Sequence, residues 1–547
     1  MEPFTNLSAT AARRLHYTLL AAVLCAFAVV YVRTAWQSDD AYISFRTVDN
    51  FVHGYGLRWN TFERVQGFTN PLWTLLLSAF VFVTREMNVT SLVVSILVSL
   101  GAVGITLRTA TRSLIGAVLG TSALFFSNAF IDYSTSGLEN PLTFFLLACF
   151  IARYFQTEQT PETLFGLALI ASLAMVNRMD TILFFAPTLA WRWWRARSVR
   201  GLVSMGVAFL PFVAWEVFSV IYYGFPWPNT AYAKLNTGIG AWPMIRQGLY
   251  YILGTFRFEP FTIGALLAGL VAPFVARKSS AIVLALGGWL YVIYVIRVGG
   301  DFMEGRHFAA PILLAAAMLA YVPWRAELGV SVFAAFTMLM LAMPYPAFLS
   351  PLDFGNDRWH AGFDPPHESM MDEHFIKDQR GCDYVFTGLL RFGKFNWEPD
   401  RVSDVKGVDN WVAWGKKERE DKERKVSAHG AIGWIGFYAG PDQYIVDWFA
   451  LTEPLLARLP PRRIDTFIIG HFNRDIPEGY LKSIETGENV IKDPGVKAYY
   501  DKLKIITQGP LWTKERWRTI WEMNTGQYEH LLDDYRAKAP DRLKKKR

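Results

Sequence analysis

The chain has 547 residues, of which 52% are hydrophobic and 19% charged, and its mean hydropathy is positive. Several apolar runs approach the roughly 20 residues that cross a bilayer, so the composition predicts a polytopic membrane protein. The net charge of +7 is spread over loops and a basic C-terminal tail. This distribution is typical of membrane topology and does not indicate a nucleic-acid-binding surface. The three cysteines are too few for a disulfide framework.

The first apolar run extends from about Tyr17 to Thr34 and ends at two adjacent carboxylates, Asp39 and Asp40. No small-residue cleavage site follows this run, so we interpret it as a retained anchor with a cytoplasmic N-terminus. A carboxylate pair beside hydrocarbon is costly and needs a polar cavity or a cationic partner. The alternative is a solvated helix cap just beyond the membrane.

The remaining spans can be counted by placing basic loops in the cytoplasm. The run 71–84 is short, and this rule places it as an interfacial helix within an outer loop of residues 35–88. Apolar runs near residues 89–107, 114–130, 141–155, 162–177, 181–194, 202–222, 260–275, 280–297, 308–322 and 328–349 then bring the total to about eleven spans. The loops at 191–200, 276–278 and 324–325 all become cytoplasmic.

The polar segment 351–547 is placed outside the membrane, as a second domain after a transmembrane domain of residues 1–350. Strand-like runs at Tyr444–Val446 and Thr466–Ile469, with helical patterns between them, predict a mixed α/β extracytoplasmic domain. Its aromatic residues form either an acceptor-holding surface or the core of the domain: Trp411, Trp414, Trp434, Tyr438 and Trp448.

Under this topology the outer loops collect ionisable and amide side chains: Asp39, Asp40, Arg46, Arg64, Asp132, Glu139, Arg178, Asp180, Asn229, Lys234, Asp301, Glu304, Arg306 and His307. Some of them can instead be explained by a purely structural role. Arg178 and Asp180 fit a hairpin ion pair, Glu139 fits a helix start, and Lys234 fits an interfacial lysine. The segment 299–307 is harder to explain by packing, because four ionisable groups lie within seven residues.

Carboxylates can bind sugar hydroxyls or accept a proton, while Arg, Lys and protonated His suit a lipid-linked phosphate. Aromatic residues at the boundary offer platforms for a sugar ring or a polyprenyl chain. No His/Cys cluster has zinc spacing and no nucleotide-binding motif is present, so the sequence requires no cofactor. An Asp- or Glu-bound Mg²⁺ or Ca²⁺ stays open.

Several motifs are familiar in combination. The segments 39–46 (DDAYISFR), 54–57 (GYGL), 63–65 (ERV) and 69–74 (TNPLWT) resemble the first outer loop of C-type (GT-C) integral-membrane glycosyltransferases. In particular they resemble the family of the actinobacterial terminal arabinofuranosyltransferase. Further matches are 135–139, 299–303, 430–433, 447–454, 470–471 and 476–480. The resemblance spans most of the chain.

The resemblance implies an α-helical GT-C fold in the bacterial inner membrane, with the active site and the C-terminal α/β domain extracytoplasmic. It implies transfer of D-arabinofuranose from a decaprenyl-phosphate carrier to an arabinan-like glycan. By the same resemblance, the catalytic carboxylate is Asp39 or Asp40. The donor phosphate would meet Arg46, Arg64, Lys234, Arg306 and His307, and the sugar pocket would be formed by Glu139, Arg178, Asp180, Asn229 and Asp301.

The family's donor and its terminal linkage are both β, which implies net retention. The aspartate is then a nucleophile or stabilises an ion pair, and the sequence leaves both open. Rival functions are a GT-C transferase of another sugar to lipopolysaccharide or a surface protein, a lipid-linked sugar transporter, and a non-catalytic scaffold. A transporter would place charges near the bilayer midplane and would often show internal repeats, and neither feature is present.

Overall fold

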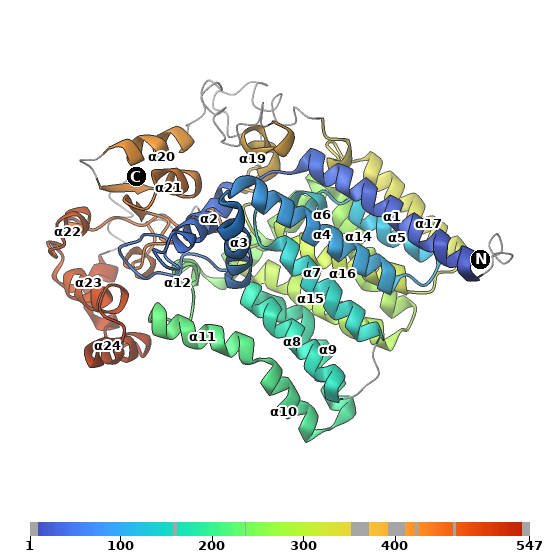
Figure 1. Cartoon of the computed structure of the whole chain (residues 1–547), viewed down its shortest axis with the longest axis horizontal. Helices are drawn as coiled ribbons and strands as arrows, with labels where there is room; N and C mark the ends of the chain where they lie inside the picture. The colour runs from blue at the N-terminus through green and yellow to red at the C-terminus, as the bar shows by residue number, and fades with distance from the viewer. Residues whose placement is uncertain are drawn as a thin grey trace. The chain divides into compact units, whose positions relative to one another are not determined.

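The computed structural model describes residues 9–156, 161–235, 237–351, 371–391, 411–421, 425–462 and 467–538. Within these ranges nearly all regular structure is helical (Figure 1), and the strands are β1 (Val426–His429) and β2 (Tyr444–Asp447). The prediction of a mostly helical chain is confirmed. The chain forms two compact units, each assembled from segments that are separated in sequence.

Unit 1 consists of residues 1–38, 88–212 and 241–398. Its helices are α1 (Ala9–Thr34), α4 (Asn88–Ala110), α5 (Leu114–Phe125), α6 (Asn128–Tyr133), α7 (Asn140–Gln156), α8 (Pro161–Asn177), α9 (Ile182–Ala196), α10 (Val199–Ala208), α13 (Ala241–Phe258), α14 (Pro260–Val275), α15 (Ser279–Val298), α16 (Ala309–Tyr321), α17 (Ala326–Leu341) and α19 (Gln379–Thr387). The sequence analysis assigned no element to α13, because its polar residues interrupt the apolar pattern.

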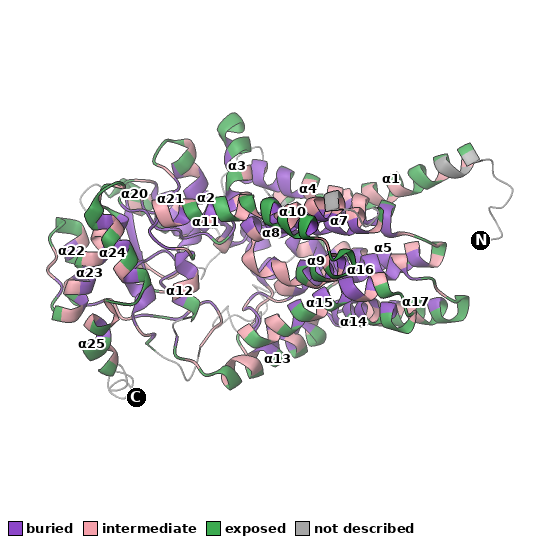
Figure 2. Cartoon of the chain, turned by 90° about the horizontal axis from the view of Figure 1, so that it is seen from below, coloured by how far each residue is buried: buried purple, intermediate pink, exposed green. Residues whose placement is uncertain are grey.

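The centre of unit 1 is α16, which is buried from Ala309 to Ala320 and packs against α4, α5, α7, α14 and α15. Its sequence is apolar on every side, as expected for a helix enclosed by others. Six of its residues are alanines in the stretch 309–320, and such small side chains let neighbouring helices approach closely. The outer helices α13 and α17 carry exposed residues along their length (Figure 2).

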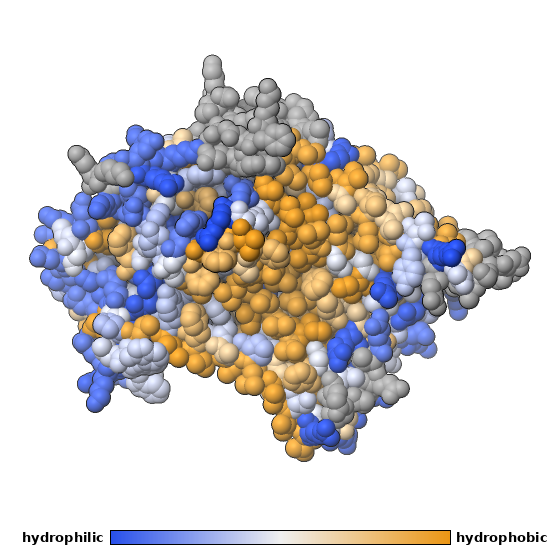
Figure 3. All heavy atoms as spheres, in the orientation of Figure 1, coloured by the Kyte–Doolittle hydropathy of each residue, from blue (hydrophilic) through white to orange (hydrophobic). Residues whose placement is uncertain are grey.

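Among the described residues, three helices are long and apolar enough to cross a membrane: Arg14–Thr34 within α1, α4 and α15. The number rises to five if the bent pairs α10 with α11 (Leu210–Tyr222) and α13 with α14 each count as one span. Hydrophobic side chains cover a broad band of the visible face over the helices (Figure 3). The chain is therefore a multi-pass membrane protein.

The predicted count of about eleven spans is not confirmed. Several apolar helices have only 10 to 17 residues. At about 1.5 Å per residue, a 16-residue helix is about 24 Å long and falls short of a hydrocarbon core of about 30 Å. The run predicted at 114–130 is also divided into α5 and α6, because Ser127 caps a new helix through the Phe130 N–H.

Unit 2 consists of residues 39–87, 213–240 and 399–547. Its elements are α2 (Asp39–Val52), α3 (Pro71–Thr84), most of α11, α12 (Asn229–Leu235), α20 (Trp411–Glu420), β1, α21 (Gly433–Ala439), β2, α22 (Tyr480–Thr486), α23 (Pro494–Thr507), α24 (Lys514–Asn524) and α25 (Asp533–Ala537). The strands are parallel, with Val426 opposite Tyr444 and His429 opposite Asp447. That α3 lies on the membrane surface stays a prediction.

These units differ from the contiguous division at residue 350. The reason lies in one hydrophobic cluster, in which Ile43, Trp59 and Phe225 pack with C-terminal residues such as Ile445 and Leu455. The segments predicted to be the first and fourth outer loops thus complete the core of the C-terminal segment. The strand predicted at Tyr444–Val446 lies within β2, whereas the described residues 467–469 contain only an isolated bridge from Ile468 to His471.

Candidate functional site

The aspartate pair opens α2, where two carboxylates favour the positive end of the helix dipole. Asp39 accepts hydrogen bonds from the backbone N–H groups of Trp434 (2.7 Å) and Gly433 (3.3 Å). These are donors that the first turn of α21 cannot satisfy internally. A Cβ at Gly433 would lie 1.8 Å from the carbonyl oxygen of Asp39, so this close approach requires glycine. Asp39 therefore joins α2 to α21.

Asp40 is the next residue of α2 and is half-buried. Successive side chains on an α-helix point about 100° apart, so Asp40 faces a different direction from Asp39. On the unit 1 side of the pair, the Ser38 N–H donates to the Ser136 carbonyl at 3.0 Å. Ser38 is thus held by the loop that carries Glu139.

Arg46 is buried two turns after the pair, and its guanidinium stacks on Trp59 at 4.3 Å. Nε donates to the Trp59 carbonyl (2.9 Å), Nη1 to that of Gly436 (2.8 Å) and Nη2 to that of Gln443 (2.7 Å). Burial lowers the pKa of Arg46 to about 9, although the charge of Asp49 opposes this shift. All three nitrogens of this predicted phosphate ligand are therefore engaged by backbone carbonyls.

Two other candidates, Arg64 and Asn229, line one hollow in unit 2 together with Arg458. Asn229 is fixed because its Nδ2 donates to the carbonyls of Ala450 (2.9 Å), Leu451 (3.2 Å) and Glu453 (3.1 Å). Lys234 does not line this hollow and is exposed near the end of α12. The structure thus brings a predicted phosphate ligand and a predicted sugar ligand together.

Within unit 1, three loops converge to form an ionic cluster. Arg178 forms a fork with Asp180, with Nε–Oδ1 and Nη2–Oδ2 distances of 3.0 and 2.6 Å, and its Nη1 contacts Glu139 Oε1 at 2.6 Å. Arg306 contacts Asp301 Oδ2 at 3.2 Å and Glu139 Oε1 at 3.6 Å. His307 Nε2 lies 3.6 Å from Asp301 Oδ2. The ionic cluster therefore consists of six predicted site residues: Glu139, Arg178, Asp180, Asp301, Arg306 and His307.

Burial and mutual charge set the protonation of this cluster. Burial acts to raise the pKa of Glu139, but the charges of Arg178 and Arg306 prevail and lower it to about 2. Burial lowers the pKa of His307 to about 4, against the charge of Asp301. Near neutral pH Glu139 is therefore ionised, whereas the imidazole of His307 is neutral.

The turn that carries three members of the cluster depends on glycine. Gly299 and Gly300 adopt φ values of 90° and 72°, a region that other residues rarely occupy. A Cβ at Gly300 would lie 2.4 Å from the ring of Tyr251. The hydroxyl of that tyrosine donates to the Met303 carbonyl at 3.0 Å and accepts from the His307 N–H at 3.2 Å. The side chain of Tyr251 thus holds both ends of this loop in place.

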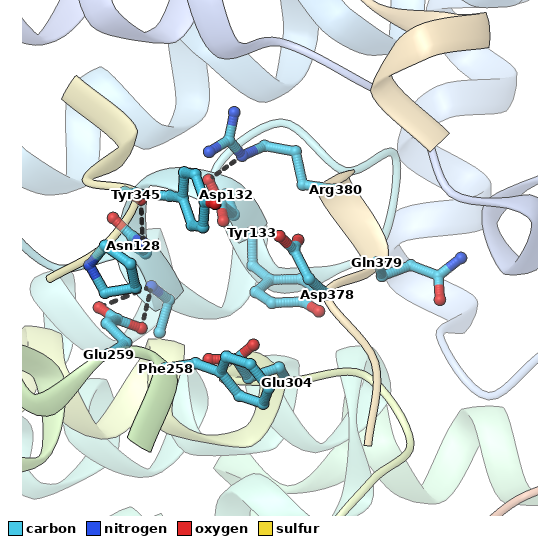
Figure 4. A pocket seen from close by; sticks show the side chains of 12 residues that line it. Asn128, Asp132, Tyr133, Phe258, Glu259, Glu304, Tyr345, Asp378, Gln379 and Arg380 are labelled. Atoms are coloured by element: carbon cyan, nitrogen blue, oxygen red, sulfur yellow. Dashed lines mark hydrogen bonds and ion pairs between the residues drawn. The ribbon is translucent and has the colours of Figure 1, made fainter. Parts of the chain in front are cut away.

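Another hollow, which lies in unit 1, is lined by acidic side chains (Figure 4). Asp132 pairs with buried Arg380 at 2.6 Å, and Glu259 accepts from the Ala129 N–H at 3.0 and 3.2 Å. Burial raises the pKa of Glu259 to about 8. Despite these acids, no group of three His, Cys, Asp or Glu side chains in the described residues is arranged to hold a metal ion.

No protein-family model matches the chain. A terminal β-(1→2)-arabinofuranosyltransferase of Mycobacterium tuberculosis (strain ATCC 25618 / H37Rv) is 29% identical over 553 residues, which cover 85% of each chain. The protein of the same description from Corynebacterium glutamicum is 27% identical over 336 residues, which cover 53% of this chain and 48% of the relative. The chain is a homologue of these arabinofuranosyltransferases. The resemblance inferred from the outer-loop motifs is therefore confirmed.

Among solved structures, that of ArnT from Cupriavidus metallidurans in the apo state aligns with 79% of this chain and 86% of its own. The sequence identity is 13% and the TM-score is 0.49, which is too low to assign the fold. The evidence for common ancestry thus comes from the arabinofuranosyltransferase relatives.

Sequence reasoning assigned no role to several buried polar residues of unit 2. Glu63 accepts from the Tyr444 hydroxyl at 2.7 Å, and this hydroxyl lies 3.5 Å from Glu453, which also accepts from Tyr480. Burial raises the pKa of Glu63 to about 7 and that of Glu453 well above its usual range. Arg458 was missed as well. Glu63 and Glu453 lie within the motifs 63–65 and 447–454 of the family resemblance, but the motifs do not reveal their contacts, because the partners are distant in sequence.

The aromatic residues considered for acceptor binding are divided between surface and core. Trp434 and Tyr438 are buried, and Trp411 packs against the core cluster. Trp414 and Trp448 are exposed. The side chains of Trp512 and Trp521, which the sequence analysis did not single out, are more exposed than those of Trp414 and Trp448.

Proposed function

We propose that the chain is a polytopic GT-C glycosyltransferase that transfers D-arabinofuranose from a polyprenyl-phosphate carrier to an arabinan-like glycan, forming a β-(1→2) linkage. The observation that carries the proposal is the similarity to terminal β-(1→2)-arabinofuranosyltransferases over 85% of the chain. The further features proposed with it are about eleven spans, a location in the bacterial inner membrane with a cytoplasmic N-terminus, and an extracytoplasmic C-terminal region that binds the acceptor.

Of the two aspartates, we assign the reacting carboxylate to Asp40. Both oxygens of Asp39 accept backbone N–H groups of α21, which suits a positioning residue. The phosphate of the donor is a good leaving group, so a carboxylate is needed to act on the acceptor hydroxyl or the anomeric carbon. Asp40 would be held for this task by its neighbour Asp39, which is bound to α21.

The ionic cluster suits sugar hydroxyls better than it suits a phosphate. The pKa values of Glu139 and Asp180 are lowered, so both are carboxylates, and His307 is neutral because burial lowers its pKa to about 4. An anionic phosphate would be repelled by these carboxylates, whereas sugar hydroxyls can donate to them. We therefore propose that Arg306 and His307 help to shape the sugar pocket with Glu139, Arg178 and Asp301.

The test is transfer from synthetic polyprenyl-phosphoryl-arabinofuranose to a short arabinan acceptor by the full-length protein. Asp40→Asn is expected to lower turnover by about 1,000-fold or more while donor binding is retained. Asp39→Asn is expected to lower turnover by a smaller factor and to lower the melting temperature, since α2 and α21 lose a charge-assisted contact. Asp49→Asn makes the same charge change later on α2 and is the matched control.

Each outcome separates one part of the proposal. Turnover that survives both substitutions would place the reacting carboxylate elsewhere. Abolished turnover in Asp39→Asn with unchanged thermal stability, together with an active Asp40→Asn, would reverse the two roles. If the wild type transferred a different sugar but not arabinofuranose, the donor assignment would be wrong while the enzyme class would stand.

A further inference from the structure

The described part of unit 2 buries five arginines, none of which has a carboxylate within 4 Å of its guanidinium: Arg46, Arg64, Arg458, Arg474 and Arg516. A buried guanidinium without an ion pair must have its donors satisfied in another way. Arg516 shows the usual solution, because Nε, Nη1 and Nη2 donate to the carbonyls of Ile506, Ile221 and Tyr222. Arg46 and Arg474 likewise engage all three nitrogens with carbonyls.

Arg458 is different. It is 6% exposed, and its Nη1 donates to the Pro454 carbonyl (2.7 Å) and to Asn229 Oδ1 (3.3 Å). Its Nη2 is buried and has no hydrogen-bond partner among the described residues. A buried donor left without a partner is destabilising, so such a group calls for an explanation.

Arg64 also has a nitrogen that makes no hydrogen bond among the described residues, Nη1, although this nitrogen is not fully buried. Its Nε donates to the carbonyl of Tyr222, and its Nη2 donates to those of Ile506 and Gly509. Arg64 and Arg458 line the same hollow, which encloses about 240 Å³ including the solvent at its mouth. No carboxylate of the described residues lines it, and the other lining residues include Tyr223, Phe225, Trp227 and Tyr232.

The guanidinium of Arg458 is held before any ligand arrives. It lies 4.2 Å from the ring of Phe225 and 4.5 Å from that of Tyr232. Stacking on aromatic rings suits the flat guanidinium and fixes its plane. Asn229 is itself anchored by three carbonyls, so its Oδ1 holds Nη1 in a fixed position.

From these contacts we infer that the hollow is an anion-binding site in which Arg458 and Arg64 together bind a phosphoryl group, with the aromatic side chains beside it. Two guanidinium groups match the oxygen geometry of a phosphate. The source of the group is either free phosphate or a lipid-linked phosphate. Assigning it to a polyprenyl phosphate rests on the proposed function.

The experiment measures binding by the full-length protein in detergent, using polyprenyl phosphate, the uncharged polyprenol of the same length and inorganic phosphate as probes. We expect the wild type to bind polyprenyl phosphate at least tenfold more tightly than polyprenol. Arg458→Gln should remove that preference, and Arg458→Lys, which keeps the charge but loses the fork, should reduce it. The control is Arg462→Gln, since the Arg462 side chain is 45% exposed and pairs with Asp475 at 3.7 Å.

The three probes distinguish the sources. Competition by inorganic phosphate at concentrations similar to those of polyprenyl phosphate would identify the free anion as the ligand. Wild-type affinity for phosphate in Arg458→Lys and Arg458→Gln would overturn the inference. If Arg458→Gln lost polyprenol binding or thermal stability as well, the Lys variant alone would decide. A wild type that bound phosphate but transferred no arabinose would leave this inference standing and refute the proposed function.

Discussion

The paired carboxyl groups of Glu63 and Glu453 should make the stability of unit 2 depend on pH. Burial raises the pKa of Glu63 from 4.5 to about 7. Since the folded-state pKa is the higher one, the stabilisation is fully present below pH 4.5 and is lost as the pH rises through about 7. At about 1.4 kcal/mol per pH unit, this difference corresponds to about 3 kcal/mol. Alkaline conditions should therefore weaken unit 2.

Thermal melting of the detergent-solubilised protein between about pH 5 and pH 8.5 measures this effect. For a cooperative unit of about 200 residues, about 3 kcal/mol corresponds to a fall of roughly 6–12 °C in melting temperature. Glu63→Gln should flatten the dependence, because a glutamine still accepts from Tyr444 but cannot ionise. Glu485→Gln on the exposed side of α22 removes the same charge and should leave the dependence intact. A pH profile of Glu63→Gln that matched the wild type would refute the reasoning.

Two further substitutions test the contacts described for each unit. Gly433→Ala should lower the unfolding free energy by about 3 kcal/mol, because the new Cβ would lie 1.8 Å from the Asp39 carbonyl oxygen. The control Gly206→Ala should stabilise α10 slightly, because a Cβ there has no atom within 4 Å. Equal melting temperatures of the two variants would contradict this. Arg178→Lys should reduce turnover at least tenfold, because a lysine cannot replace the forked contact with Asp180. The control Arg257→Lys, in an exposed ion pair with Glu373, should have no effect on turnover. Unchanged turnover in Arg178→Lys would show that Arg178 is not part of the site.

Much of unit 1 could be predicted from the sequence because its signals are local. Apolar runs gave the positions of α4, α7, α8, α9, α14, α15 and α16 to within a few residues. The density of charge in the predicted outer loops indicated the ionic cluster, and the structure brings Glu139, Arg178 and Asp301 from three loops into it. The partners of each charge could not be predicted, because they depend on which loop ends meet in three dimensions.

Unit 2 was harder to predict because its core is non-local. Trp59 and Phe225 pack with residues more than 200 positions later in the chain, so a boundary drawn from the change in composition near residue 350 divides a single core. The contacts of buried Glu453 and Arg458 could not be predicted for the same reason. Their partners Tyr444, Tyr480 and Asn229 are known only from the three-dimensional structure. No periodicity or motif reports such contacts.

The motifs that carry the family resemblance in unit 2 also have mechanical roles, and these bear on how the site is assigned. The segment 430–433 brings the α21 N–H groups to Asp39, and the segment 450–453 supplies the carbonyls that hold Asn229. A motif residue whose polar atoms are fully used in this way is suited to positioning its neighbours and not to contacting the sugar. By this criterion we propose that the ligands meet the groups that the motifs hold in place, Asp40 beside Asp39 and Arg458 beside Asn229. A side chain that its neighbours already hold in position loses little conformational freedom when a ligand binds.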